Sequence, residues 1–213
     1  MTKLIVIEGS DLSGKSTIAK TVASQFNYRH EHEPTFSSTY ADTINFSKLD
    51  AYQREFYFTI DRFKHQEILN KYNIILDRYR ITGLTYAATF GPEALKMAQA
   101  VYGLPEFKKP NLTIFIDMLP DDAMQLNELR RNTESFNPKL DINILIKLRN
   151  NFYEQIEFAC NNWDEDVIIH KPIFGDLNKT IKNVYNEINN YLATWITANS
   201  VITVVIIPAI KPI

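Results

Sequence analysis

The chain has 213 residues, of which 45% are hydrophobic and 12% aromatic, a length and composition suited to one domain with a substantial core. Its formal net charge of −2 argues against a nucleic-acid binder, because such proteins usually carry a strongly basic surface. The single cysteine, Cys160, excludes an internal disulfide and a cysteine-rich metal site. The N-terminus leads directly into the first predicted strand and leaves no room for a signal peptide, so a reducing, cytoplasmic location is expected.

The first predicted element is a buried strand over residues 4–7, an apolar run without helical periodicity. The residues after it match the phosphate-loop pattern G-x-x-x-x-G-K-[ST]. In such a loop, backbone N–H groups and the N-terminus of the next helix bind phosphate, and that helix is expected from about 14 to 25. A plain glycine turn is the alternative. The nucleotide-binding residues predicted here are Gly9, Ser10, Asp11, Leu12, Ser13, Gly14, Lys15, Ser16 and Thr17.

A second strand is expected over residues 29–33, ended by Pro34, whose nitrogen cannot donate to a sheet. Residues 36–39 are polar and predict a loop. A long helix follows from 50 to 72, and its apolar positions are Phe56, Ile60, Phe63 and Leu69. The aromatic run 56–58 is most simply interpreted as core, although an aromatic face can also stack on a nucleobase.

A third strand over residues 74–76 ends at Asp77, and Arg78 follows it. In P-loop kinases an acid at this place lies near Mg²⁺, and Ser16 would be the other residue at the ion. The arginine can bridge two phosphate groups, because its planar fork is permanently charged. A helix N-cap with a surface ion pair is the alternative for the two residues. We therefore predict a Mg²⁺ site at Ser16 and Asp77.

Helices are expected over 84–89 and 92–101, then a fourth strand over 112–117 and a helix that starts at Pro120. Arg130 and Arg131 lie near the end of that helix, before an irregular stretch over 133–138. Arginines on such a flap can close over a transferring phosphoryl group. Two solvated cations that match the helix dipole are an equal alternative.

The last elements are a helix over 141–161, a strand over 167–169 and a helix over 177–192. Strands that alternate with helices predict one three-layer α/β/α domain over residues 1–195, with a five-stranded parallel sheet. Residues 196–213 form an apolar extension, in which the run Val201–Ile207 is too short to span a membrane and is expected to add an edge strand or a contact segment. The apolar face expected on the helix over 141–161 comprises Ile144, Leu148, Phe152, Ile156 and Ala159.

Several motifs in a fixed order resemble the thymidylate kinases, a family of P-loop nucleoside monophosphate kinases. The likeness extends from Leu4 to about Tyr191. It depends on the following residues, in chain order: Ile7-Glu8-Gly9, Gly14-Lys15-Ser16-Thr17, Glu33-Pro34, Phe58 and Arg62, Asp77-Arg78-Tyr79, Thr82, Tyr86, Pro110-Asn111-Leu112-Thr113, Asp117, and Leu148-Arg149.

The resemblance implies roles for these residues around an acceptor nucleotide. Asp11 would bind the deoxyribose 3′-hydroxyl, Phe58 would stack on thymine, and Arg62 would hydrogen-bond the edge of the base. Arg78 would hold the acceptor phosphate. The substrate-binding residues implied are Asp11, Glu33, Phe58, Arg62, Arg78, Thr82, Gly83 and Tyr86.

Thr82 and Gly83 would lie along the base, and Tyr86 would cover the 2′ position of the sugar. The catalytic residues implied are Lys15, Arg78, Arg130 and Arg131. A helical lid would carry the last two. Leu12 stands where one subgroup of the family has an arginine in the loop, so here the lid would supply that charge.

The activity implied is the ATP- and Mg²⁺-dependent phosphorylation of dTMP to dTDP by a homodimer without a membrane or nucleic-acid partner. His32, Thr35 and Phe36 depart from the family pattern around Glu33-Pro34, so a kinase of another or modified pyrimidine deoxynucleotide, or of a deoxynucleoside, is an alternative. A second alternative is a non-catalytic nucleotide-dependent switch.

Overall fold

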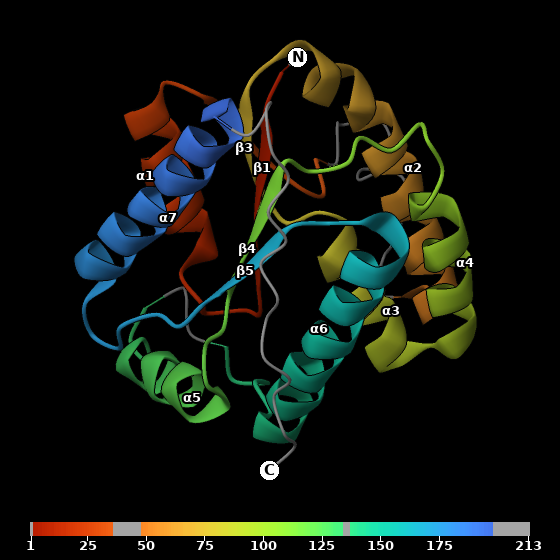
Figure 1. Cartoon of the computed structure of the whole chain (residues 1–213). Coiled ribbons are helices and arrows are strands. Elements are labelled where there is room, and N and C mark those ends of the chain that lie inside the picture. Colours follow the sequence, from red (N-terminus) through yellow and green to blue (C-terminus); the bar gives the residue numbers. More distant parts are fainter. Residues whose placement is uncertain (1, 36–47, 134–136, 198–213) are drawn as a thin grey trace.

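The structure is a computed structural model that describes residues 2–35, 48–133 and 137–197. Within these ranges strands alternate with helices as predicted (Figure 1). The strands are β1 (Leu4–Gly9), β2 (Arg29–His32), β3 (Ile74–Asp77), β4 (Leu112–Ile116) and β5 (Val167–His170). The helices are α1 (Lys15–Phe26), α2 (Ala51–Lys71), α3 (Arg80–Phe90), α4 (Pro92–Tyr102), α5 (Pro120–Leu129), α6 (Ile142–Trp163) and α7 (Leu177–Thr197).

The strands form one five-stranded sheet in the order β2-β3-β1-β4-β5, and each neighbouring pair is parallel. The predicted α/β fold is therefore confirmed. Because all the strands run in the same direction, their carboxyl ends lie at one edge of the sheet. The phosphate loop after β1, Asp77 at the end of β3 and Asp117 after β4 thus share that edge.

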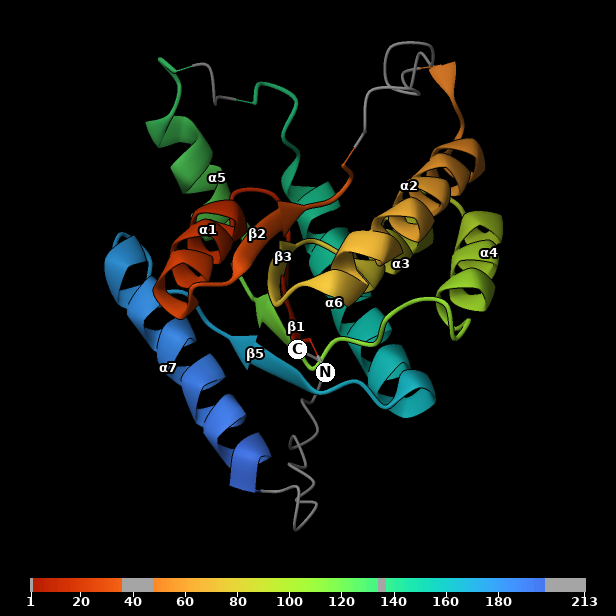
Figure 2. The ribbon, with the colours of Figure 1, turned by 90° about the horizontal axis from the view of Figure 1, so that it is seen from above.

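Helices cover both faces of the sheet (Figure 2). On one face, α1 and α7 bury Ile18, Val22 and Val184 against Ile5 and Ile7 of β1. On the other face, α2, α3 and α6 pack against the sheet, and α4 lies outside α2 and α3. Burial of both faces explains why the strands are apolar runs instead of alternating patterns.

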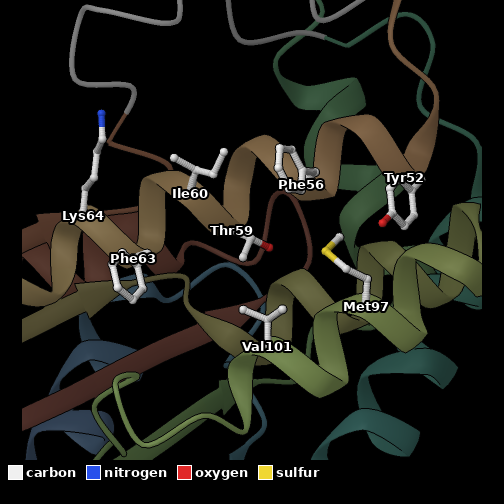
Figure 3. A pocket seen from close by; sticks show the side chains of 8 residues that line it. All are labelled: Tyr52, Phe56, Thr59, Ile60, Phe63, Lys64, Met97 and Val101. Atoms are coloured by element: carbon white, nitrogen blue, oxygen red, sulfur yellow. The ribbon is translucent and has the colours of Figure 1, made fainter.

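The apolar prediction for α2 is wrong in part. Leu69 is fully buried, but Phe56 is 47% exposed and Phe63 is 54% exposed. Figure 3 shows them with Ile60 on a groove that Met97 and Val101 of α4 also line. The buried side of α2 is mostly polar, because it packs on a hydrogen-bonded network instead of on the apolar sheet; its buried residues are Glu55, Thr59, Asp61, Arg62, His65, Gln66 and Leu69.

Two further differences have local causes. On α6, Ile144 is exposed and Leu145 is buried in its place, because α5 packs there and contributes Ala123 to the same cluster. The other four predicted apolar positions of α6 are buried. Helix α3 begins at Arg80, four residues before the predicted start. The carboxylate of Glu8, on β1, accepts hydrogen bonds from N–H groups of its first turn.

Some predictions lie outside the described residues. These are the loop over 36–39, the middle of the irregular stretch over 133–138, and the run Val201–Ile207. Helix α7 continues to Thr197, past its predicted end at 192. None of the helices in the described ranges is long and apolar enough to cross a membrane.

Candidate active site

The phosphate loop connects β1 to α1. Gly9 has φ 157°, and a Cβ atom there would lie 2.7 Å from Ser13 Oγ and 3.0 Å from the carbonyl oxygen of Ile116, so this position accepts only glycine. Gly14 is the N-cap of α1, in the left-handed conformation. The helix therefore starts directly from the loop, and the N–H groups of its first turn have no helical partner. This arrangement can bind an anion, as predicted for the loop.

Lys15 lies inside the loop and is 5% exposed. Its Nζ donates to the carbonyl oxygen of Ser10 at 3.1 Å and lies 3.9 Å from Asp11 Oδ1. Burial, together with the charge of Arg78, lowers the pKa of this ammonium to about 8. A buried ammonium held this close to anion-binding N–H groups favours an incoming phosphate, which would replace its lost hydration.

Arg78 faces the loop from the end of β3. Its Nη2 lies 2.5 Å from Asp11 Oδ1, and its guanidinium lies 5.8 Å from the centre of the Tyr86 ring. The Tyr86 hydroxyl lies 3.5 Å from Asp11 Oδ2. Although burial works against ionisation of Asp11, the charges of Arg78 and Lys15 lower its pKa. Four residues predicted for the site thus meet at the mouth of the phosphate loop.

Asp77 is fully buried beside the same loop. Its Oδ2 lies 3.1 Å from Nδ1 of His32, while Oδ1 is buried with no hydrogen-bond partner among the described residues. Burial acts to raise the pKa of this carboxyl, but the hydrogen bond from His32, the neighbouring Ser16 hydroxyl and the charge of Lys15 lower it. An ionised carboxylate with an unused oxygen next to a serine hydroxyl fits the oxygen donors that Mg²⁺ prefers.

Arg62, the arginine predicted to bind the base, lies in a buried network. Arg62, 3% exposed, donates through Nε to Glu33 at 2.9 Å and through Nη1 to Glu55 at 3.1 Å. The hydroxyl of Tyr102 contacts both Arg62 and Glu55, and His65 Nδ1 lies 3.0 Å from Glu33. The network fixes the guanidinium from three sides. Glu33 therefore pairs with Arg62 and His65 at this depth instead of lying at an open surface.

Gly83 lies directly against this network. A Cβ atom there would lie 2.5 Å from Arg62 Nη1 and 2.9 Å from Glu55 Oε1, which explains a glycine in the middle of α3. Thr82 is 6% exposed and donates its hydroxyl to Glu8. Phe58 is half-buried on the same helix as Arg62. Of the residues predicted to lie around the base, Arg62, Thr82 and Gly83 are buried, and Phe58 is partly exposed.

The two lid arginines lie at the end of α5. Arg130 is the C-cap of that helix, and Arg131, the next residue, donates to Glu128 of the helix at 2.9 Å. Figure 1 places α5 at the same edge of the sheet as the phosphate loop. Helix α5, whose C-cap is Arg130, therefore lies at this edge of the sheet, and Arg131 pairs with Glu128 of the same helix.

The prediction missed several residues of the site. Glu55, His65 and Tyr102 complete the Arg62 network, and Glu8 supports α3. The sequence contains one signal for the first of them, because Glu55 and Arg62 are seven residues apart on a predicted helix and so lie on the same side. Tyr102 comes from α4 and gives no such signal. Asp117 and Arg149 were predicted as family motif residues without a role, and Asp117 binds Arg149 through both oxygens, at 2.6 and 2.8 Å.

Comparisons with known proteins identify the family. The family match is to thymidylate kinase over residues 7–166. The probable thymidylate kinase of Methanococcus vannielii is 26% identical, with 88% of this chain and 94% of the relative covered. The thymidylate kinase of Caenorhabditis elegans is 27% identical over 88% of this chain and 90% of its own length.

Two solved structures share the fold. The thymidylate kinase of Candida albicans has a TM-score of 0.62 at 23% identity and covers 91% of this chain and 92% of its own. A deoxyadenosine kinase from M. mycoides with bound dCMP has a TM-score of 0.64 at 16% identity, with 88% and 99% covered. The fold, the phosphate loop and the family match lead to one conclusion: this chain belongs to the thymidylate kinase family and is a nucleoside monophosphate kinase.

Proposed function

We propose that the protein transfers the γ-phosphoryl group of ATP to the 5′-phosphate of dTMP, giving dTDP and ADP. The observation that carries the proposal is the position of Arg78, whose guanidinium reaches Asp11 inside the phosphate loop. A phosphate bound by Arg78 would therefore lie beside the γ-phosphate of a nucleotide in the loop. The acceptor phosphate already carries a nucleophilic oxygen, so catalysis depends mainly on positioning and on neutralising charge.

The residues in the site divide the work. Lys15 would contact the transferring group, and Arg78 would hold the acceptor phosphate. Ser16 and Asp77 would hold Mg²⁺, which when bound supplies further neutralisation of phosphate charge. Arg130 or Arg131 would complete the site once α5 moves closer, as expected for arginines on a lid. Asp11 and Tyr86 would contact the sugar, and Phe58 and Arg62 the thymine.

An acceptor panel tests the proposal. Release of ADP is measured with ATP and each of dTMP, dUMP, dCMP, thymidine and TMP, the ribonucleotide of thymine. We expect dTMP to give the highest kcat/KM and the ribonucleotide to give little turnover, because Tyr86 would exclude the 2′-hydroxyl. A higher kcat/KM with thymidine than with dTMP would contradict the proposal.

A deoxynucleoside kinase is the second candidate. The deoxyguanosine kinase of Dictyostelium discoideum is 23% identical, and the M. mycoides structure above is a deoxyadenosine kinase. A hydroxyl acceptor needs a general base, whereas the carboxylate of Glu33 is buried and paired with Arg62 and His65. A phosphate acceptor needs no general base, and Lys15 and Arg78 supply the positive charge that would bind it. The site therefore favours a monophosphate acceptor.

The groove between α2 and α4 supports the homodimer that the resemblance implies. It has a volume of about 560 Å³, and Phe56 and Phe63 on its rim are about half exposed. We propose that a second copy of the chain covers this face, which would remove that apolar surface from water. The double variant F56S/F63S should sediment as a monomer, while the wild type and I146S, altered at an exposed residue of α6, should sediment as dimers. A monomeric wild type would contradict the proposal.

The proposed domain spans residues 1–195, and the role of the extension over 196–213 stays open between an edge strand and a contact segment. A cytoplasmic location also stays a prediction.

A further inference from the structure

Glu8 is the last residue of β1 before the phosphate loop, and it is 1% exposed. Its Oε1 accepts hydrogen bonds from the backbone N–H groups of Tyr79, at 3.1 Å, and of Thr82, at 3.2 Å. Its Oε2 accepts from the hydroxyl of Thr82. Burial raises the pKa of the carboxyl to about 7, although the hydrogen bonds from Thr82 act against that rise. None of the substrate-binding, metal-binding or catalytic roles assigned above uses this buried acid.

Glu8 accepts hydrogen bonds from N–H groups at the start of α3 that have no partner within the helix. The first N–H groups of a helix need partners from outside the helix, and the N-cap residue here, Tyr79, supplies no side-chain bond. Glu8 accepts from two of these groups across 71 and 74 residues of sequence. A negative charge at this end also matches the helix dipole. Helix α3, which carries Thr82, Gly83 and Tyr86, is therefore fixed to β1 at its first turn.

The same bonds hold a strained turn. Arg78 has φ 70°, in the left-handed region that residues other than glycine rarely adopt. Its own N–H donates to the carbonyl oxygen of Ile7 at 3.0 Å, and the next N–H, that of Tyr79, donates to Glu8. Such conformations persist only where the surroundings hold them firmly. Two consecutive residues of β1 hold the two sides of this turn, and the phosphate loop begins at the next residue.

We infer that Glu8 is a positioning residue, which fixes the backbone of Arg78 and the first turn of α3 relative to the phosphate loop. It thereby sets the distance between the acceptor phosphate and the donor phosphate. This inference rests on the proposed function, since it gives Arg78 the acceptor phosphate. Glu8 itself is buried, and it acts through the geometry of its hydrogen bonds to Tyr79 and Thr82.

Two conservative variants separate geometry from charge. In E8Q the side chain keeps its length, its carbonyl oxygen can accept from both N–H groups, and its amide can donate to the Thr82 hydroxyl. In E8D the charge stays, but the side chain is one carbon shorter and cannot reach both N–H groups. We expect E8D to lower kcat/KM for dTMP about 100-fold, with the KM for ATP changed less than about threefold, and E8Q to stay within about fivefold of the wild type.

The control is E165Q, which changes another buried acid that contacts α3, through Arg80, from the side away from the phosphate loop. All variants are assayed at a temperature where circular dichroism shows them folded. E165Q should lower the melting temperature without lowering kcat. Loss of turnover in E8Q equal to that in E8D, or normal turnover in E8D, would overturn the inference.

A double-mutant cycle tests whether Glu8 acts through Arg78. We expect R78K to keep measurable turnover but to lose the fork that would hold the acceptor phosphate. If Glu8 acts by placing Arg78, then E8D in the R78K background should lower kcat/KM by less than about fivefold. Full additivity would overturn the inference. A wild type that does not phosphorylate dTMP, or an unaffected R78K, would instead contradict the proposed function, so the two failures are distinguishable.

Discussion

The phosphate loop occupies one continuous stretch from Gly9 to Thr17, whereas the surface that faces it is assembled from β1, β2, α2, α3 and α4. In the loop, each functional group is set by the backbone of its neighbours. On the facing side, the position of Arg62 depends on Glu33, Glu55 and Tyr102, which are 29, 7 and 40 residues away. Substitutions in the loop should therefore affect chemistry, and substitutions in the network should affect stability and acceptor binding together.

The largest effect is expected from K15A. The lysine would contact the transferring phosphoryl group, so its removal should lower kcat at least about 10³-fold. The melting temperature should change little, because the contacts of Nζ with described residues lie within the loop. A coupled assay for ADP and a thermal melt check the two halves of the prediction, and near-normal turnover would refute the assigned role.

Removal of Arg62 should act mainly on stability. In R62A the carboxylates of Glu33 and Glu55 stay buried and lose a cation, which typically costs about 3–5 kcal/mol in unfolding free energy. Urea unfolding measures the loss. R131A is the matched control, because its pair with Glu128 is exposed and should contribute less than about 1 kcal/mol. Equal losses of unfolding free energy in R62A and R131A would show that the buried network stabilises the fold no more than an exposed ion pair does.

The titration of Glu8 should make the free energy of unfolding depend on pH. Its pKa rises from 4.5 to about 7 on folding. The folded state therefore holds the proton more tightly, and this contribution to stability is complete below about pH 4.5 and is lost as the pH rises through about 7. At about 1.4 kcal/mol per pH unit, the full loss is about 3 kcal/mol.

E8Q removes this titration. The unfolding free energy of E8Q minus that of the wild type should therefore increase as the pH rises from 5 to 8, measured by urea unfolding at each pH. Parallel curves for the two proteins would mean that Glu8 has an ordinary pKa in the folded state.

The smallest effect is expected from G83A. The added methyl group would lie 2.5 Å from Arg62 Nη1, so the guanidinium must move, at a cost of about 1–3 kcal/mol. The KM for dTMP should rise about tenfold, because the displaced arginine faces the base less well. The KM for ATP is the internal control and should stay unchanged. An increase in the KM for ATP as well as for dTMP would mean that the substitution also disturbs the phosphate loop.

By itself, the sequence determined the parallel α/β fold, the phosphate loop and the order of the family motifs, because these depend on residues that are neighbours along the chain. It also placed Asp77 and Arg78 at the end of a strand, where the parallel sheet brings them to the loop. It misjudged α2, since hydrophobic spacing predicts an inward apolar face and Phe56 and Phe63 lie outward.

Only the tertiary structure decided which polar residues of α2 are buried, and why. Arg62 can be buried because Glu33, directly after β2, Glu55 of α2 and Tyr102 of α4 surround one guanidinium. Likewise, α3 begins early because the carboxylate of Glu8 accepts the N–H groups of its first turn. The free energy of a buried polar group depends on partners that are distant in sequence, so local patterns cannot reveal it.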